Sequence, residues 1–206
     1  MYNPAHFHEQ RPEVLRAFLA QHPLATLVAQ TADGLVANHL PLLCDWTRDA
    51  GVLRGHVARA NPLWRALAAD APVLAIFGGA SAYVSPSWYP SKAETGKVVP
   101  TWNYAVVHAH GTLRFFDDKE RVRALVTDLT AEHERALPQP WKPADAPPDY
   151  LDAMLAAIVG FEIAVARLEG KFKASQNKSP VDRGGVANAF GDLAPADRGE
   201  LIRDPD

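Results

Sequence analysis

The stretch that decides the fold is LATLVAQTADGLVANHLPLL, residues 24–43. Residues 24–30 and 35–43 are both β-compatible runs, and the segment Thr31–Gly34 between them ends in an Asp-Gly pair. Asp-Gly between two such runs is a strong hairpin signal, because both residues tolerate the positive φ that a tight hairpin turn requires. The stretch therefore predicts two adjacent antiparallel strands.

Further apolar and alternating segments extend this β pattern along the chain. Strands are expected at residues 51–58, 72–77, 83–84, 102–116 and 159–168. The strand 72–77 is expected to end at Gly78-Gly79, since glycine pairs commonly interrupt strands. Turns of hairpin length join most of these strands, which favours an antiparallel barrel or sandwich over a βαβ sheet.

Helices are expected mainly near the two ends of the chain and in two crossover segments. They are predicted at residues 9–21, 63–69, 119–135, 150–157 and 179–190, and residues 191–206 are expected to form a loose helical tail. The fold class predicted from the pattern is mainly β with peripheral helices.

Composition limits the class of protein. The chain has 206 residues, of which 48% are hydrophobic and 22% are charged, values of a soluble globular domain. No apolar run approaches the roughly 18 residues of a membrane span, and no signal peptide is recognised at the start. The single cysteine, Cys44, is interpreted as a small buried hydrophobe. We expect a cytoplasmic protein with no membrane partner.

Charge and missing motifs exclude several functions. A net charge of −3 argues against broad non-specific nucleic-acid binding. The dinucleotide-binding G-x-G-x-x-G, the P-loop, H-E-x-x-H and the G-x-S-x-G elbow are all missing from the sequence. His108 and His110 lie two apart on an expected strand and so face the same way. Because no carboxylate or further histidine is close to them in sequence, no metal site is expected.

Residues 83–104, YVSPSWYPSKAETGKVVPTWNY, concentrate aromatic side chains. The chain has five Trp and five Tyr in all, and half of these ten residues lie in this stretch. Rigid aromatics, proline-fixed turns and scattered polar groups suit a site for a flat ligand with polar edges. A proline-rich loop that covers the edge of the core would have the same composition, so both interpretations stay open.

Two segments offer positive charge to an anion. Residues 55–62, GHVARANP, run from a strand end into a helix start, where free N–H groups and Arg59 favour a phosphate. The alternative is that Asn61 only caps the helix and that Arg59 is a solvated charge. Residues 171–183 form the most basic segment. This segment could close on a ligand, meet a partner subunit, contact nucleic acid or remain a solvated loop.

Several of these motifs together resemble the PaiB-type family. They are ANHLP (37–41), GHVARANP (55–62), AYVSPSWY (82–89), VPTWNY (99–104) followed by VHAHG, KASQN (173–177) and the N-terminal MYNPAHF. Members of this family are described as FMN-binding negative transcriptional regulators. The resemblance runs from Met1 to about Ala189, and the order of the motifs makes it specific.

The resemblance implies a split β-barrel of the FMN-binding type. It implies one domain over residues 1–190, comprising an N-terminal helical segment (1–23), barrel strands (24–116), a helical excursion (117–158) and a last strand with a basic loop and helix (159–190), followed by a tail (191–206). This fold usually forms a homodimer with two FMN sites at its interface, and both subunits contribute to each site.

The same resemblance implies a set of cofactor-binding residues. Asn38, His39 and Leu40 lie on the strand that would line the isoalloxazine ring. His56, Arg59 and Asn61 correspond to the phosphate side, with Arg59 pairing the phosphate. Ser85, Trp88 and Tyr89 would wall or cover the ring. Thr101, Trp102, Asn103 and Tyr104 would begin a long strand near the dimer interface. Lys173, Ser175, Gln176 and Asn177 would close the site from the C-terminal side.

Three functions remain open at this point. The first is an FMN-binding protein that regulates transcription negatively, with any DNA contact made by the C-terminal basic segment. The second is an FMN-dependent oxidoreductase or flavin reductase, in which His39 and His56 are the nearest candidate proton donors. The third is a haem-binding protein with His108 or His110 as the axial ligand.

Overall fold

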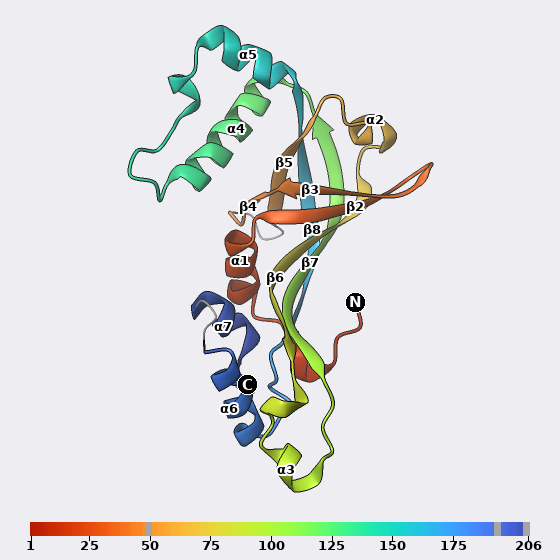
Figure 1. Ribbon diagram of the computed structural model, residues 1–206. Coiled ribbons are helices and arrows are strands. Elements are labelled where there is room, and N and C mark those ends of the chain that lie inside the picture. The colour runs from red at the N-terminus through yellow and green to blue at the C-terminus, as the bar shows by residue number, and fades with distance from the viewer. Residues whose placement is uncertain (48–50, 192–194, 204–206) are drawn as a thin grey trace. The chain divides into compact units, whose positions relative to one another are not determined.

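The computed structural model describes residues 1–47, 51–191 and 195–203, which form a mainly antiparallel sheet with flanking helices (Figure 1). The strands are β1 (His8–Glu9), β2 (Leu24–Thr31), β3 (Gly34–Pro41), β4 (Leu43–Asp45), β5 (Val52–Ala58), β6 (Ala71–Val84), β7 (Thr101–Phe116) and β8 (Ile158–Lys173). The α-helices are α1 (Pro12–Gln21), α2 (Leu63–Ala66), α3 (Ser91–Thr95), α4 (Lys119–Glu134), α5 (Pro148–Ala156), α6 (Pro180–Ala189) and α7 (Pro195–Leu201). Short 3-10 helices are η1 (Ala5–Phe7), η2 (Pro86–Trp88) and η3 (Pro143–Asp145).

The strand order confirms the antiparallel fold predicted from the sequence. Neighbouring strands follow the order β3-β2-β6-β7-β8-β5-β4, and β1 pairs with β8. The predicted hairpin is present, with β2 and β3 in register from Leu24 opposite Pro41 to Thr31 opposite Gly34. Gly34 has a φ of +116°, which a residue without a Cβ adopts readily in this tight turn.

Strand β6 does not end at Gly78-Gly79, and β8 continues past Gly170, contrary to the sequence prediction. The reason is that two of these glycines admit helix α1 rather than interrupt a strand. A Cβ on Gly79 would lie 2.7 Å from the ring of Phe18, and a Cβ on Gly170 would collide with the side chain of Leu15. Glycine within a strand is therefore used here for close packing.

The two short strands, β1 and β4, were not expected from the sequence. His8 and Glu9 pair with Lys171 and Gly170 of β8, so helix α1 starts at Pro12 and not at Glu9. A two-residue strand carries too little pattern to be recognised without its partner.

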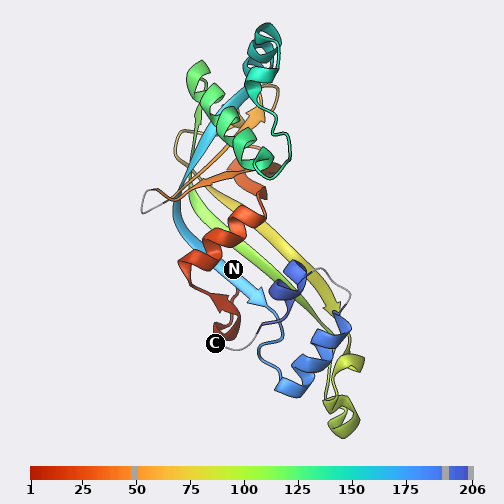
Figure 2. The same ribbon diagram turned by 90° about the vertical axis from the view of Figure 1, so that its left-hand side faces the viewer.

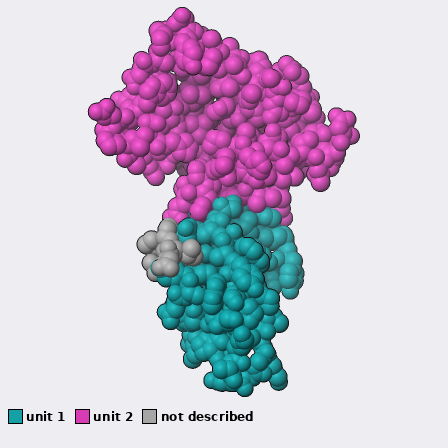
Figure 3. Space-filling view, in the orientation of Figure 1, with its two compact units in different colours: residues 1–18, 78–108, 169–206 teal, residues 19–77, 109–168 magenta. Residues whose placement is uncertain are grey.

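The chain divides into two compact units, shown in different colours in Figure 3. Unit 1 comprises residues 1–18, 78–108 and 169–206, and unit 2 comprises residues 19–77 and 109–168. In unit 2, α4 and α5 lie side by side (Figure 2) and pack through Val122, Leu151 and Leu155. No helix in the described parts of either unit combines the length and apolar composition needed to cross a membrane.

Unit 1 has its own core around the aromatic stretch. Val84 and Tyr89 pack there against Val186 of α6, against Phe190 at the C-cap of α6 and against Leu201 of α7. Within the expected tail, residues 195–201 form helix α7, whose last residue, Leu201, is buried, while residues 192–194 and 204–206 lie outside the described residues.

A buried amide links the beginning of β7 to the turn after β8. Asn103, which is 1% exposed, donates through Nδ2 to Oγ of Ser175 at 2.9 Å and to the carbonyl of Leu201 at 2.8 Å. Ser175 has a φ of +64°, an unusual conformation for a residue other than glycine. The motifs PTWNY and KASQN, far apart in sequence, therefore form one hydrogen-bonded structure.

We predict that Gly79→Ala destabilises the protein by about 1–3 kcal/mol, because the added methyl group would overpack the contact with Phe18 and the Glu200 carboxylate. Gly78→Ala is the matched control, since a Cβ at Gly78 meets no atom within 4 Å. Urea denaturation of both variants and the wild type measures the difference. Equal stability of the two variants would show that α1 does not require the glycine.

We also predict that Asn103→Asp costs at least about 3 kcal/mol, because a buried carboxylate oxygen would replace Nδ2 and face the Leu201 carbonyl, and two acceptors cannot form a hydrogen bond. The exposed Asn177 offers the same substitution as a control, and Asn177→Asp should change stability by less than about 0.5 kcal/mol. Thermal and urea unfolding check both values. If the unfolding midpoint of Asn103→Asp equalled that of the wild type, these hydrogen bonds would not contribute to stability as predicted.

Candidate functional site

In unit 2, two of the sequence motifs meet at a pocket. Asn38 of β3 accepts a hydrogen bond through Oδ1 from Nδ2 of Asn61, at 2.7 Å. Asn61 lies in the turn before α2, and its Oδ1 accepts from the backbone N–H of Leu63 at 3.0 Å. Both side chains line a cavity of about 620 Å³, which we call the Asn38–Asn61 pocket.

The wall of this pocket is mostly apolar. Its lining residues are Thr31, Asp33, Val36, Ala37, Asn38, Ala60, Asn61, Pro62, Leu63 and Ala66. None of these described lining residues carries a positive charge. Of this set, only Asn38 and Asn61 were predicted from the sequence to bind the cofactor. The other lining residues lie in or near the motifs ANHLP and GHVARANP in the sequence, and this position could have indicated them.

The remaining β3 and β5 candidates lie apart from the two asparagines. His39 is exposed and follows Asn38 on the strand, so it faces the other side of β3, where it hydrogen-bonds Oγ1 of Thr26 at 3.0 Å. Leu40 is half-buried, on the same side of β3 as Asn38. His56 on β5 is half-buried too, and burial lowers the pKa of its imidazole.

Arg59 is held by protein groups. Its Nη1 donates to Oδ2 of Asp117 at 2.7 Å, and its Nη2 donates to Oδ1 of the same carboxylate. Its Nε and Nη2 also donate to the carbonyls of Ala156 and Ile158. The hydrogen bonds that Arg59 donates to Asp117 lower the pKa of that carboxyl group. Arg59 lines a separate cavity of about 240 Å³, so the structure does not bring it together with the two asparagines.

The aromatic stretch belongs to unit 1, where part of it packs in the core and part of it lies at the surface. Ser85 caps η2 by accepting from the backbone N–H of Ser87 at 3.2 Å. Trp88 packs edge-on against Phe190, and Tyr89 is buried in the core. Tyr83 and Trp102, by contrast, are about half exposed and form an edge-to-face pair at the surface.

The end of β8 and the turn after it carry a group of cations that we call the lysine cluster: Lys171, Lys173 and Lys178. Lys173 donates to Oγ1 of Thr101 and to the carbonyl of Trp102, the latter at 2.6 Å. Burial lowers the pKa of Lys173, and the ammonium groups of Lys171 and Lys178 lower it further.

Aromatic rings accompany the other two lysines. The Nζ atom of Lys171 lies 5.5 Å from the ring centre of Tyr104, and that of Lys178 lies 5.0 Å from the ring centre of Tyr89. Gln176 of the same turn is used locally, because its side chain accepts from the N–H of Ala174 and donates to the carbonyl of Phe172. The candidates at the ends of β7 and β8 therefore lie together, while those of β3 and β5 belong to the other unit.

These donor sets suit a flat aromatic group that carries a phosphate. A cavity of about 620 Å³ with apolar walls and two amides matches pockets that hold a ring with polar edges. The phosphate requires cations, which the pocket lacks and the lysine cluster offers. The residues present thus fit the chemistry of FMN, an isoalloxazine ring linked to a phosphate.

Comparison with known proteins agrees. The profile of the family described as "Putative FMN-binding domain" matches residues 1–167. A relative from Bacillus subtilis named "Protease synthase and sporulation protein PAI 2" is 34% identical, over 88% of this chain and 85% of its own length. An uncharacterized protein of Emericella nidulans is also 34% identical, over 98% of this chain and 94% of its own length.

A solved structure supports the fold. The FAD and heme binding protein from Mycobacterium smegmatis superposes with a TM-score of 0.56 at 20% identity, covering 80% of this chain and 72% of its own. At that identity the likeness concerns the fold alone. The family match, the relatives and the sheet lead to one conclusion: the chain belongs to the PaiB-type family of FMN-binding proteins, it has their split β-barrel fold, and its cofactor is FMN.

Proposed function

We propose that the Asn38–Asn61 pocket of one chain binds the isoalloxazine ring of FMN and that the lysine cluster of the partner chain binds its phosphate, so that both chains of a homodimer contact each cofactor. The observation that carries this proposal is that the neutral amides and the cations lie in two different places. The pocket holds amides and no cation, whereas the lysine cluster holds cations that repel one another.

The pocket suits the ring because its polar groups are neutral and few. The Nδ2 of Asn61 and the Oδ1 of Asn38 already form a hydrogen bond, which fixes the orientation of both amides. A fixed amide offers a donor or an acceptor to the edge of a flavin with little further loss of side-chain entropy. The apolar wall from Val36, Pro62 and Leu63 excludes water from the faces of the ring.

The lysine cluster suits the phosphate because the charged groups that act on Lys173, at its centre, are positive. The charged groups that shift the pKa of Lys173 are both lysines, so the charges acting on it among the described residues are positive. A phosphate dianion would relieve this repulsion and accept charge-assisted hydrogen bonds. The exposed ring of Trp102, whose carbonyl bonds Lys173, offers a surface for stacking beside it.

When bound, FMN supplies the electron and hydride chemistry. The side chains of this protein bind and orient the cofactor: the amides hold the ring edge, the apolar wall keeps water away and the lysines neutralise the phosphate. Asp33 is the one titratable group among the described residues that line the pocket, which suits cofactor binding more than proton transfer.

We predict that Lys173→Met weakens FMN binding at least about tenfold and leaves riboflavin binding within about twofold, because a charge-assisted hydrogen bond contributes roughly 1.5–3 kcal/mol. Riboflavin lacks the phosphate, so the pair of ligands isolates the phosphate contact. Asn38→Ala should weaken the binding of both ligands by a similar factor. Flavin fluorescence titrations of the apo-protein measure all four affinities.

Lys97→Met is the matched control, because Lys97 is an exposed lysine of the same unit outside the lysine cluster. Its affinities for FMN and riboflavin should equal those of the wild type. Equal losses of FMN and riboflavin affinity in Lys173→Met would contradict the assignment of the phosphate. Wild-type affinities in Asn38→Ala would contradict the assignment of the ring.

The role we propose for the FMN-bound protein is negative regulation of transcription. Support comes from the similarity to PAI 2, which extends over most of both chains, and from the basic C-terminal segment. The described helices nevertheless offer no evident recognition helix, so base contacts would have to come from loops.

The second candidate is an FMN-dependent oxidoreductase acting on a small molecule. It is favoured by the size of the pocket, about 620 Å³, which is open to a ligand beside a flavin ring. His39 and His56, the expected proton donors, do not line this pocket in the described residues. A proton would therefore have to come from the substrate, from solvent or from Asp33.

Two assays on the FMN-loaded protein distinguish these roles. For a regulator, we expect selection from a pool of random-sequence duplexes to enrich a defined sequence, with an affinity that falls as salt rises. NAD(P)H oxidation should then stay at the rate of free FMN. Steady NAD(P)H oxidation without any enriched sequence would replace the regulatory role with the oxidoreductase.

A further inference from the structure

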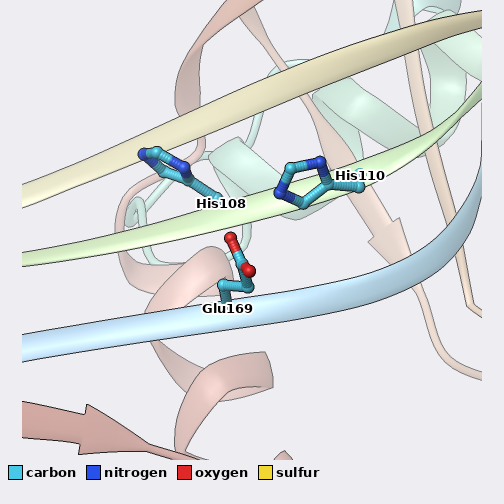
Figure 4. A group of neighbouring side chains, drawn as sticks. All are labelled: His108, His110 and Glu169. Carbon is cyan, nitrogen blue, oxygen red and sulfur yellow. The ribbon is translucent and has the colours of Figure 1, made fainter. Parts of the chain in front are cut away.

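A second group of chemically active side chains lies on β7 and β8. His108 and His110 project from the same face of β7, as the sequence predicted, and Glu169 of β8 points toward them (Figure 4). One ligand atom from each of the three side chains lies within 4.8 Å of the other two. The carboxylate was not expected from the sequence, because β8 is distant from β7 along the chain.

We propose that His108, His110 and Glu169 bind a divalent transition-metal ion, with Zn²⁺ the preferred ion. Two imidazoles and one carboxylate are a common protein ligand set for catalytic zinc, and they leave one or more coordination positions to water or another ligand. The same set with open positions also suits Fe²⁺. The donors are nitrogen and oxygen without thiolate, which disfavours Cu⁺ and iron–sulfur clusters.

The backbone places these donors well. Alternate residues of a strand share one face, so the two imidazoles arise from one rigid segment, with Ala109 buried on the other face between them. Strand β8, which carries Glu169, is the neighbour of β7 in the sheet. All three side chains are half-buried, which limits competition from solvent without closing access to an ion.

The charged N-terminus also contacts this cluster. The amino group of Met1 lies 3.1 Å from Oε2 of Glu169, so a metal ion would compete with that ion pair. A metal–carboxylate bond would replace this ion pair, and the free energy of metal binding would have to exceed that of the pair. None of the three ligands belongs to the residues proposed to bind FMN, so this inference is independent of the proposed function.

The cluster also bears on the haem alternative. A haem needs one axial ligand and a large apolar pocket for the macrocycle. Three side chains that converge within 4.8 Å are instead arranged for a single ion. Metal binding and haem binding are therefore competing uses of the same histidines, and one set of variants distinguishes them.

The test is zinc titration by isothermal calorimetry of tag-free, full-length, FMN-loaded protein after chelator treatment and dialysis. We expect about one Zn²⁺ per chain. His110→Ala and Glu169→Gln should each weaken zinc binding by more than about a hundredfold. Residues that only orient a metal ligand change the affinity by at most about a hundredfold, so a larger loss indicates a direct ligand. His133→Ala removes an exposed histidine of α4 and should retain wild-type affinity.

Circular dichroism and FMN titration show whether each variant is folded, so that a loss of zinc binding is attributed to the ligand. Two outcomes would overturn the proposal: no zinc binding by the wild type at tens of micromolar, or unchanged affinity in both ligand variants. A Soret band on addition of haemin that His108→Ala abolishes, together with no zinc binding, would assign these histidines to haem.

Discussion

The amide of Asn103 is the interaction on which the arrangement of unit 1 depends. Its hydrogen bonds to Ser175 and to the carbonyl of Leu201 join the start of β7, the turn after β8 and the end of α7. A buried amide left without partners would cost far more than an exposed one, so these three segments are held together strongly. The same bonds stabilise the left-handed backbone of Ser175.

The lysine cluster takes its position from this structure. Lys173 immediately precedes the turn and reaches back to Thr101 and Trp102, next to Asn103. A lysine whose pKa is lowered by burial and by neighbouring lysines is an unfavourable arrangement in the free protein. Such an arrangement persists where the surrounding structure stabilises it, and it is the observation that supports the proposed binding of a phosphate.

Arg59 illustrates how a charge that looks available in sequence is used for structure. The segment GHVARANP suggested a phosphate site at the start of a helix. In the folded chain the guanidinium holds Asp117 and two carbonyls, and it thereby joins the turn after β5 to the segments that flank α4 and β8. The neighbouring Asn61 turns instead to Asn38, and the amide pair, rather than the arginine, lines the larger pocket.

The sequence by itself determined the antiparallel class, the hairpin of β2 and β3, the longer helices and the family, because these follow from local periodicity, turn residues and motif order. It also predicted that His108 and His110 share a face, which is a property of any strand. Tertiary structure alone decided that Gly79 and Gly170 admit α1, that Asp117 engages Arg59, and that Glu169 lies beside the histidines. Each of these is a contact between residues distant in sequence, and no local pattern specifies which partner a side chain meets when the strands pair.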